Sequence, residues 1–251
     1  MRRVLDWAAC WNVRDLGGYA TRSGATTNYR RVVRAGNLSK LTPSGKDALV
    51  AYGVRTVIDL RDPKEFAVDL NPFQEGGQWR GEVRYLNVPL ISERGWEALR
   101  DPELRKRGYA LIVEIEGPSI ARVLNAMVQA AEGAVVLHCH AGKERTGVVA
   151  ALLLELAGVP DDTIAEDFVA SDAHLEALYE EWARREEDPV KRGQLLASFR
   201  SEAAHIAAPL EYVRTHGGID AYLLQAGVSA DALSALRARL LDPTPNDLGG
   251  S

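Results

Sequence analysis

A cysteine and an arginine six residues apart stand near the middle of the chain, in the stretch Val135-Val136-Leu137-His138-Cys139-His140-Ala141-Gly142-Lys143-Glu144-Arg145-Thr146-Gly147. The β-branched residues at its start predict a buried strand, and the apolar run 148–156 after it predicts a buried helix. In such a strand–loop–helix unit, the loop amides and the helix N-terminus converge on one anion. The spacing therefore predicts a phosphate-binding loop that carries a nucleophile.

The residue types in this loop fit covalent catalysis on a phosphate ester. A cysteine attacks as the thiolate, and a helix N-terminus stabilises that anion at Cys139. The guanidinium of Arg145 can hold two phosphate oxygens at once, which the point charge of a lysine cannot do. We expect the hydroxyl of Thr146 to hydrogen-bond the sulfur, and Gly142 and Gly147 to allow close approach of the backbone.

These residues match the signature loop of the cysteine-dependent protein tyrosine phosphatase superfamily. The full stretch HCHAGKERTG resembles most the bacterial tyrosine phosphatase family related to the mycobacterial secreted phosphatase B, which typically has HC-x-AGKDRTG. Glu144 stands where that family has aspartate. The segments 12–18 (NVRDLGG) and 34–38 (RAGNL) resemble the same family in the same order, so the resemblance spans nearly the whole chain.

The leaving group needs a proton donor, and three carboxylates are candidates. Charged residues at the end of a strand in an α/β sheet face the ligand crevice, so Asp59 is the first candidate. Its Asp-Leu-Arg context again resembles the family. Glu144 is the second candidate. In many tyrosine phosphatases the aspartate of a W-P-D tripeptide is the general acid, but no such tripeptide is present in 91–118, so Asp101 is the third candidate. Glu65 reads as a surface charge.

The remaining site residues are expected to bind or to support. The expected phosphate- and substrate-binding residues of the loop are His140, Ala141, Gly142, Lys143 and Thr146. We expect His138 to lie behind the loop and hold Cys139, and Arg61 to support the site. Arg14 and Asp15 are expected to form an ion pair beside the loop, with a substrate contact by Arg14 as the lesser alternative.

A metal site at His138-Cys139-His140 is not favoured. Neighbouring residues of a strand point to opposite faces, and no CxxC or HxxxH motif supplies further ligands. We therefore expect neither a metal nor a cofactor, because Arg145 and the loop amides supply the electrostatics.

Composition limits the partners. The chain has 251 residues, 46% of them hydrophobic, and a net charge of −5, which does not suggest nucleic-acid or stable membrane binding. Its two cysteines, Cys10 and Cys139, offer no disulfide framework. The apolar run after Met1 is broken by Asp6, so we expect no signal peptide and, by default, a cytoplasmic protein; secretion without a classical signal stays open.

The alternation of strand and helix patterns predicts an α/β fold with a mostly parallel central sheet flanked by helices. The resemblance implies the tyrosine-phosphatase type of this fold. We expect one domain over 1–242 and a disordered tail over 243–251. Two helical patterns in 171–215 predict either a lid over the pocket or helices packed on the core.

The expected reaction is hydrolysis of phosphomonoesters through a phosphocysteine intermediate. Phosphotyrosine proteins lead as substrates because a phenoxide leaves readily. Phosphoinositides stay open because Lys143 and His140 flank the pocket, and a phosphoinositide phosphatase is the alternative main role. Phosphoserine and phosphothreonine stay open because a shallow pocket would favour them. The basic cluster Arg100, Arg105, Lys106 and Arg107 either attracts acidic ligands or is a solvated face. The rival classes are a rhodanese-type sulfurtransferase and an inactive phospho-ligand binding module; oligomeric state is not predicted.

Overall fold

The computed structural model describes residues 1–66, 69–74 and 83–241. It contains one five-stranded sheet in the order β1-β2-β5-β3-β4, in which only the β1–β2 pair is antiparallel. The strands are β1 (Arg14–Asp15), β2 (Val32–Ala35), β3 (Val54–Asp59), β4 (Arg84–Asn87) and β5 (Ala134–His138). The predicted α/β fold with a mostly parallel sheet is confirmed. The predicted disordered tail, 243–251, lies outside the described residues.

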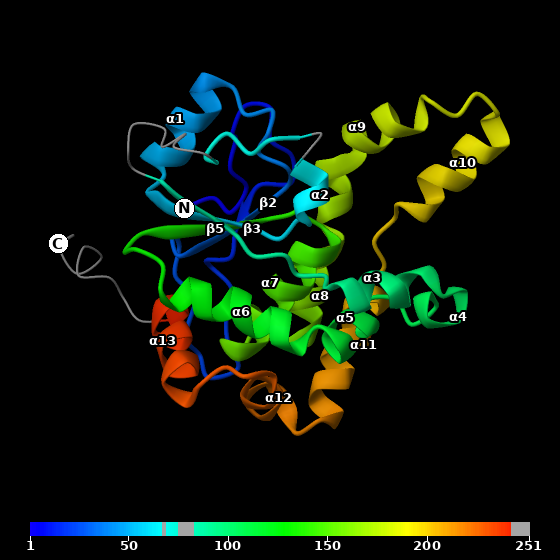
Figure 1. Cartoon of the computed structure of the whole chain (residues 1–251). Helices are drawn as coiled ribbons and strands as arrows, with labels where there is room; N and C mark the ends of the chain where they lie inside the picture. The colour runs from blue at the N-terminus through cyan, green and yellow to red at the C-terminus, as the bar shows by residue number, and fades with distance from the viewer. Residues whose placement is uncertain (67–68, 75–82, 242–251) are drawn as a thin grey trace.

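The helices surround this sheet (Figure 1). They are α1 (Pro43–Ala51), α2 (Pro63–Phe66), α3 (Glu93–Arg100), α4 (Pro102–Arg105), α5 (Ala110–Ile115), α6 (Gly117–Val128), α7 (Glu144–Leu156), α8 (Asp161–Val169), α9 (Ser171–Ala183), α10 (Pro189–Ser198), α11 (Ala203–Thr215), α12 (Gly218–Ala226) and α13 (Ala230–Leu241). Within the described residues, no helix is long and apolar enough to cross a membrane.

Strand β5 lies at the centre of the sheet, between β2 and β3, and all five of its residues are buried. Such burial on both faces is usual for parallel strands and explains the unbroken β-branched run. In the sheet register, His138 pairs with Ala35 of β2 and with Asp59 of β3. The carboxyl ends of these three strands therefore lie at one edge of the sheet, where α/β proteins bind ligands.

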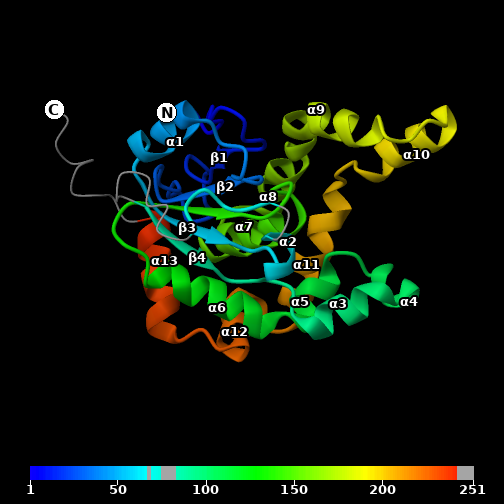
Figure 2. The same cartoon turned by 45° about the horizontal axis from the view of Figure 1, so that its top comes forward.

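Two apolar cores sandwich the sheet. Leu49 of α1 packs with Val33, Val57 and Val136 on one face. On the other face, α6 and α7 contribute to a larger core that contains Val135 and Leu137. Figures 1 and 2 show α1 on one side of the sheet and α6 with α13 on the other. The alternating strand residues thus pack into opposite layers.

Helix α7 starts inside the predicted phosphate loop, at Glu144, and not at Val148. Ten of its thirteen residues are buried, which explains why the sequence shows no amphipathic period there. The segment 91–118, in which the W-P-D tripeptide is missing, forms three short helices, α3 to α5, and the start of α6.

The helical patterns in 171–215 form three helices and not two. The second pattern divides at Phe199–Glu202, and α11 continues through Pro209. Helices α9 and α10 form a hairpin that projects from the body on the same side as α3 and α4 (Figure 2). No residue of α10 is buried, whereas α9 buries Leu175, Leu178 and Tyr179.

Candidate active site

The loop predicted to bind phosphate joins the end of β5 to the start of α7. Cys139 lies directly after β5 and is only 1% exposed. Gly142 has φ +67°, and a Cβ atom there would lie 2.3 Å from the carbonyl oxygen of Ala35. Only glycine allows the loop to turn this close to β2. A Cβ atom at Gly147 would lie 3.0 Å from the ring of Phe168, so glycine also lets α7 pack closely on α8.

Two buried side chains hold the loop by its carbonyl groups. The amide nitrogen of Asn12 donates to the carbonyl oxygens of Ala141 and Gly142, both at 3.1 Å. The guanidinium of Arg34 donates from Nη2 to the Gly142 carbonyl at 2.7 Å. Both residues lie in the segments that resemble the family, but neither was among the supporting residues that we singled out from the sequence. Carbonyls turned towards these donors leave the loop N–H groups free to face an anion.

Arg14 does not pair with Asp15, so that prediction was wrong. Neighbouring residues on a strand point to opposite faces, and β1 consists of these two residues. Arg14 instead donates from Nε to Asp167 of α8 at 3.3 Å and is buried, so it has no access to substrate. Arg34 donates from Nη1 to the second oxygen of Asp167 at 2.5 Å.

The carboxylate of Asp15 lies on the side of β1 opposite to the Arg14 side chain. It accepts hydrogen bonds from the backbone N–H groups of Gly17, at 2.6 Å, and Arg30, at 2.8 Å, and from the hydroxyl of Tyr52. Burial raises the pKa of Asp15 above its usual value, although these hydrogen bonds oppose the shift. Asp15 therefore supports the N-terminal segment and not the phosphate loop.

Arg145 is held by a partner that was read from the sequence as a surface charge. Its Nη1 and Nη2 donate to the two carboxylate oxygens of Glu65 at 2.5 and 2.9 Å. Burial would raise the pKa of Glu65, but the hydrogen bonds and charge of Arg145 outweigh it, so the pKa is lowered. This bidentate pair fixes the guanidinium plane, and no hydrogen bond to Nε is present among the residues that the structure describes. Glu65 lies on α2, six residues beyond Asp59, and only that proximity to the strand end signals it in the sequence.

Asp59 lies beneath the loop in a closed cluster. It accepts from Arg61, with Nη2–Oδ2 at 2.7 Å, and its Oδ2 lies 3.3 Å from Nε2 of His138. All three side chains are completely buried. Burial would raise the pKa of Asp59, but His138 and Arg61 together hold it well below its usual range. Asp59 is completely buried and does not line the cavity above the loop, so its carboxylate does not fit the predicted role of proton donor.

The same cluster places His138 behind the loop, as its predicted role requires. Nδ1 of His138 lies 3.2 Å from the carbonyl oxygen of Cys139, and Nε2 lies 2.9 Å from the side-chain nitrogen of Asn71. Arg61 also donates to the backbone carbonyl of Asp69. Hydrogen bonds therefore connect the end of β3, the backbone of Cys139 and the chain around 69–71.

A cavity of about 340 Å³ opens over the loop, and Glu144 is the candidate proton donor that lines it. The other lining residues are Glu65, Tyr109, His140, Ala141, Lys143, Arg145, Tyr179, Trp182, Ser198, Phe199, Arg200 and His205. The Glu144 side chain is 42% exposed, so it can exchange protons with solvent. Asp101 instead caps α4, accepting from the backbone N–H of Glu103 at 2.8 Å, and does not line this cavity.

Lys143 and His140 line the cavity as predicted, but both are engaged by the α9–α10 hairpin. The buried ammonium of Lys143 donates to the carbonyl of Phe199 and lies 5.3 Å from the ring centre of Tyr179. The ring of His140 stacks on Trp182 at 5.4 Å. Ala141 packs against Leu175 and other apolar residues of the hairpin. This placement over the loop is consistent with the predicted lid.

Two further predictions concern side chains around the loop. The hydroxyl of Thr146 is buried and forms no hydrogen bond within the described residues, so the predicted bond to the sulfur is not present. In the basic cluster, Lys106 pairs with Glu103 and Arg107 with Glu114, which favours a solvated face.

No three His, Cys, Asp or Glu side chains in 1–66, 69–74 and 83–241 lie together as a metal site would require.

Comparisons with known proteins identify relatives of this chain. A tyrosine-protein phosphatase of Nostoc commune is 30% identical over 219 residues, which cover 83% of this chain and 73% of the relative. The triple specificity protein phosphatase PtpB of Mycobacterium tuberculosis is 26% identical over an alignment of 279 residues, covering 95% of this chain and 99% of that protein. The crystal structure of TpbA from P. aeruginosa matches with a TM-score of 0.42 at 17% identity, covering 83% of this chain and 96% of that one.

The family model described as "tyrosine phosphatase family" matches residues 5–242, nearly the whole length of the chain. The matched region contains the loop 139–145, the residues that hold it and the cavity above it. The chain belongs to the tyrosine phosphatase family.

Proposed function

We propose that the chain hydrolyses phosphomonoesters through a phosphocysteine intermediate formed on Cys139, with phosphotyrosine proteins as the main substrates. One observation carries this proposal. Cys139 lies in the loop from which Arg145 extends into the cavity, and Glu65 holds that guanidinium by its Nη1 and Nη2 atoms. Family membership supports phosphotyrosine as the substrate.

In the first step, the thiolate of Cys139 attacks phosphorus in line, the S–P bond forms and the bond to the leaving oxygen breaks. The loop amides and Arg145 bind the three equatorial oxygens, over which the negative charge of the transition state is spread. Asn12 and Arg34 contribute indirectly, because they fix the loop carbonyls and thus the direction of the amides.

Glu144 is the proton donor in this proposal, which replaces our first expectation, Asp59. Its carboxyl group gives a proton to the leaving oxygen, and the resulting carboxylate then takes a proton from the water that attacks the phosphocysteine. The new O–P bond forms as the S–P bond breaks, so inorganic phosphate leaves and the thiolate of Cys139 is restored. Glu144 lines the cavity, whereas Asp59 is buried beneath the loop. Asp59, with Arg61, is a positioning residue that holds His138.

The breadth of substrates is a separate part of the proposal. The mycobacterial relative is named a triple specificity protein phosphatase. That name supports testing more than phosphotyrosine here, and we include serine, threonine and inositol phosphates. Lys143 is less available to a second phosphate than expected, because its ammonium already binds the Phe199 carbonyl. We therefore retain phosphotyrosine as the leading substrate and treat phosphoinositides as the alternative.

The test is turnover of an aryl phosphate and of phosphotyrosine, phosphoserine, phosphothreonine and phosphoinositide substrates. Wild type should release phosphate, and Cys139→Ser should not, although it should still bind a phosphotyrosine peptide. Wild type with no turnover of any of these would overturn the proposal in favour of a phospho-ligand binding module. Turnover of thiosulfate without phosphatase activity would indicate a sulfurtransferase.

Two carboxylate variants then separate the proposed roles. Glu144→Gln should lower kcat by about 10²–10⁴-fold on a phosphoserine peptide, since an alkoxide needs the proton most, and less on an aryl phosphate with a good leaving group. Asp59→Asn should destabilise the protein and lower kcat equally for both leaving groups. A larger loss on the alkyl ester for Asp59→Asn than for Glu144→Gln would reverse the assignment.

A further inference from the structure

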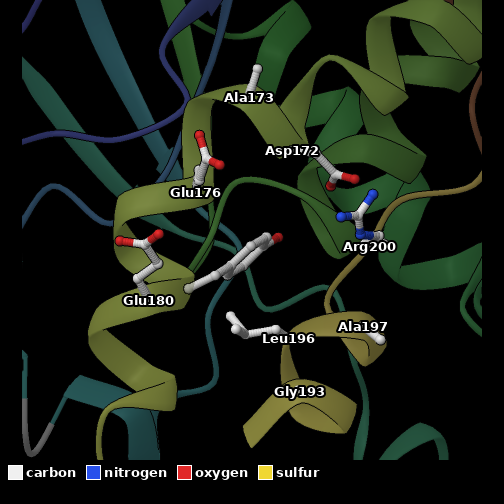
Figure 3. Close-up of a pocket in the computed structure, with 9 residues that line it drawn as sticks. Asp172, Ala173, Glu176, Glu180, Gly193, Leu196, Ala197 and Arg200 are labelled. Atoms are coloured by element: carbon white, nitrogen blue, oxygen red, sulfur yellow. The ribbon is translucent and has the colours of Figure 1, made fainter.

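A second cavity, of about 430 Å³, lies between α9 and α10 beside the active-site cavity (Figure 3). Tyr179 and Arg200 line both cavities, so the two are neighbours. Leu196 and Gly193 of α10 form part of the wall opposite α9. The second cavity is therefore adjacent to the place where the phosphate of a substrate would bind.

The wall formed by α9 is acidic. Asp172, Glu176 and Glu180 recur at four-residue intervals along α9, and all three line the cavity. Figure 3 shows Glu176 and Glu180 near each other and Asp172 apart from them, beside Arg200. Asp172 is already bound, since Ser201 donates to it from its hydroxyl at 2.6 Å and from its backbone nitrogen at 2.8 Å. Glu176 and Glu180 are exposed, and neither forms an ion pair within the described residues. Like charges at this spacing destabilise a helix unless a cation lies between them.

A buried hydroxyl without a partner points to the same cavity. Tyr179 is only 7% exposed, and its hydroxyl has no hydrogen-bond partner in the described part of the chain. Burial raises the pKa of Tyr179, helped by the charges of Glu144 and Asp172, so the hydroxyl stays neutral. The ring is held by Phe199, stacked at 4.9 Å. A buried polar group left unpaired is unfavourable, and a ligand N–H would satisfy its oxygen.

We propose that this cavity is a second substrate subsite that binds a lysine or arginine side chain close in sequence to the phosphorylated residue. The charged end would lie beside Glu176 and Glu180 on the α9 wall, and its apolar stem would pack on Leu196. Arg200 lines both cavities, and Figure 3 shows it beside Asp172. The inference rests on the proposed function, because the phosphate in the loop anchors the rest of the substrate.

The experiment uses phosphotyrosine peptides in which each of the three positions before and after the phosphotyrosine carries Lys, Ala or Glu, one position at a time. For wild type, Lys at one or more positions should raise kcat/KM by about three- to tenfold over Ala, the range expected for partly solvated ion pairs. In Glu176→Gln/Glu180→Gln this advantage should fall below about twofold.

The matched control is Glu181→Gln/Glu187→Gln, which removes the same charge from two exposed residues of the same hairpin that do not line the cavity. It should keep the preference for Lys, and all three proteins should hydrolyse p-nitrophenyl phosphate alike. The inference is wrong if wild type prefers Lys at no position, or if the preference survives in Glu176→Gln/Glu180→Gln. A preference for Glu that is lost in Arg200→Ala would also overturn it, since the cavity would then bind an anion. Failure of wild type on p-nitrophenyl phosphate would instead count against the proposed function.

Discussion

Arg145 shows how one side chain depends on another that is remote in sequence. In the proposed reaction the guanidinium presents a fixed edge to phosphate, and Glu65 would fix that edge by binding the Nη1 and Nη2 atoms. A charge-assisted bidentate pair of this kind is directional as well as strong. The position of Arg145, and therefore transition-state binding, should be sensitive to a residue that does not touch the phosphate.

Glu65→Gln should lower kcat/KM for an aryl phosphate by roughly tenfold or more, because one of the two hydrogen bonds and the ion pair are lost. The effect should fall mainly on kcat, since the substrate still binds to the loop amides. Steady-state kinetics at pH 7 measure it. Glu97→Gln, on the exposed surface of α3, is the control and should match wild type. Equal kcat/KM for both variants would show that Arg145 needs no such support.

The pH dependence of this pair has a definite sign. Arg145 lowers the pKa of Glu65, so the ion pair is intact above the pKa of an unfolded glutamate and is lost as the pH falls through the lowered value. Acidification should therefore weaken the orientation of Arg145 only below the usual titration range of a glutamate.

At the scale of elements, Asp167 joins four parts of the fold. Its carboxylate binds Arg14 of β1 and Arg34 of β2, and Tyr19 donates to it at 2.8 Å. Arg14 and Arg34 also approach the hydroxyl of Ser171, the first residue of α9. Helix α8 and the base of the α9–α10 hairpin are thus connected to β2, whose Arg34 also binds the Gly142 carbonyl of the loop.

Asp167→Asn should reduce the free energy of unfolding by about 3 kcal/mol at pH 7, because two buried guanidinium groups lose their counter-charge. The pKa of Arg14, lowered to about 10 by burial and by Arg34, reflects that crowding of positive charge. Urea unfolding followed by circular dichroism measures the change. Glu166→Gln, exposed on the same helix, should stay within about 0.5 kcal/mol of wild type.

The stability difference between wild type and Asp167→Asn should also depend on pH. Burial would raise the pKa of Asp167, but Arg34 and Arg14 lower it to about 2, against about 3.9 in an unfolded chain. Its stabilisation is therefore complete above about pH 4 and is lost as the pH falls towards 2. The difference between wild type and Asp167→Asn should shrink over that interval. A difference that stays constant down to pH 2 would contradict the ion-pair account.

At the scale of the whole molecule, burial is uneven. The central strand β5 is buried throughout and α7 nearly so, whereas α10 buries no residue. Local opening costs little where few apolar contacts break. The part of the molecule that covers the cavity is therefore joined more weakly than the part that carries Cys139.

Native-state hydrogen exchange should show this contrast. Amides of β5 and α7 should exchange only through global unfolding, while amides of α10 should exchange by local opening, with protection lower by at least about tenfold. The measurement is exchange at pH 7 in increasing urea: α10 should show little dependence on urea at low concentrations. Protection in α10 equal to that in α7 would contradict the expected weak attachment.

Local sequence was sufficient for the sheet and the reactive loop. The β-branched run before Cys139, the cysteine-to-arginine spacing and the apolar run after it predicted the strand, the loop and the helix. These features are readable because burial and backbone geometry impose them within a few neighbouring residues. The fold class followed from the order of such elements along the chain.

The partners of the loop required the folded chain. Arg14 was expected to pair with Asp15 but binds Asp167, 153 residues away in sequence. Asp59 was expected to give a proton but is enclosed by Arg61 and His138. Glu65 was read as a surface charge but holds Arg145. Sequence shows which charges exist, whereas their burial and pairing depend on how distant elements pack, and that packing determines whether a carboxylate acts on substrate or supports the site.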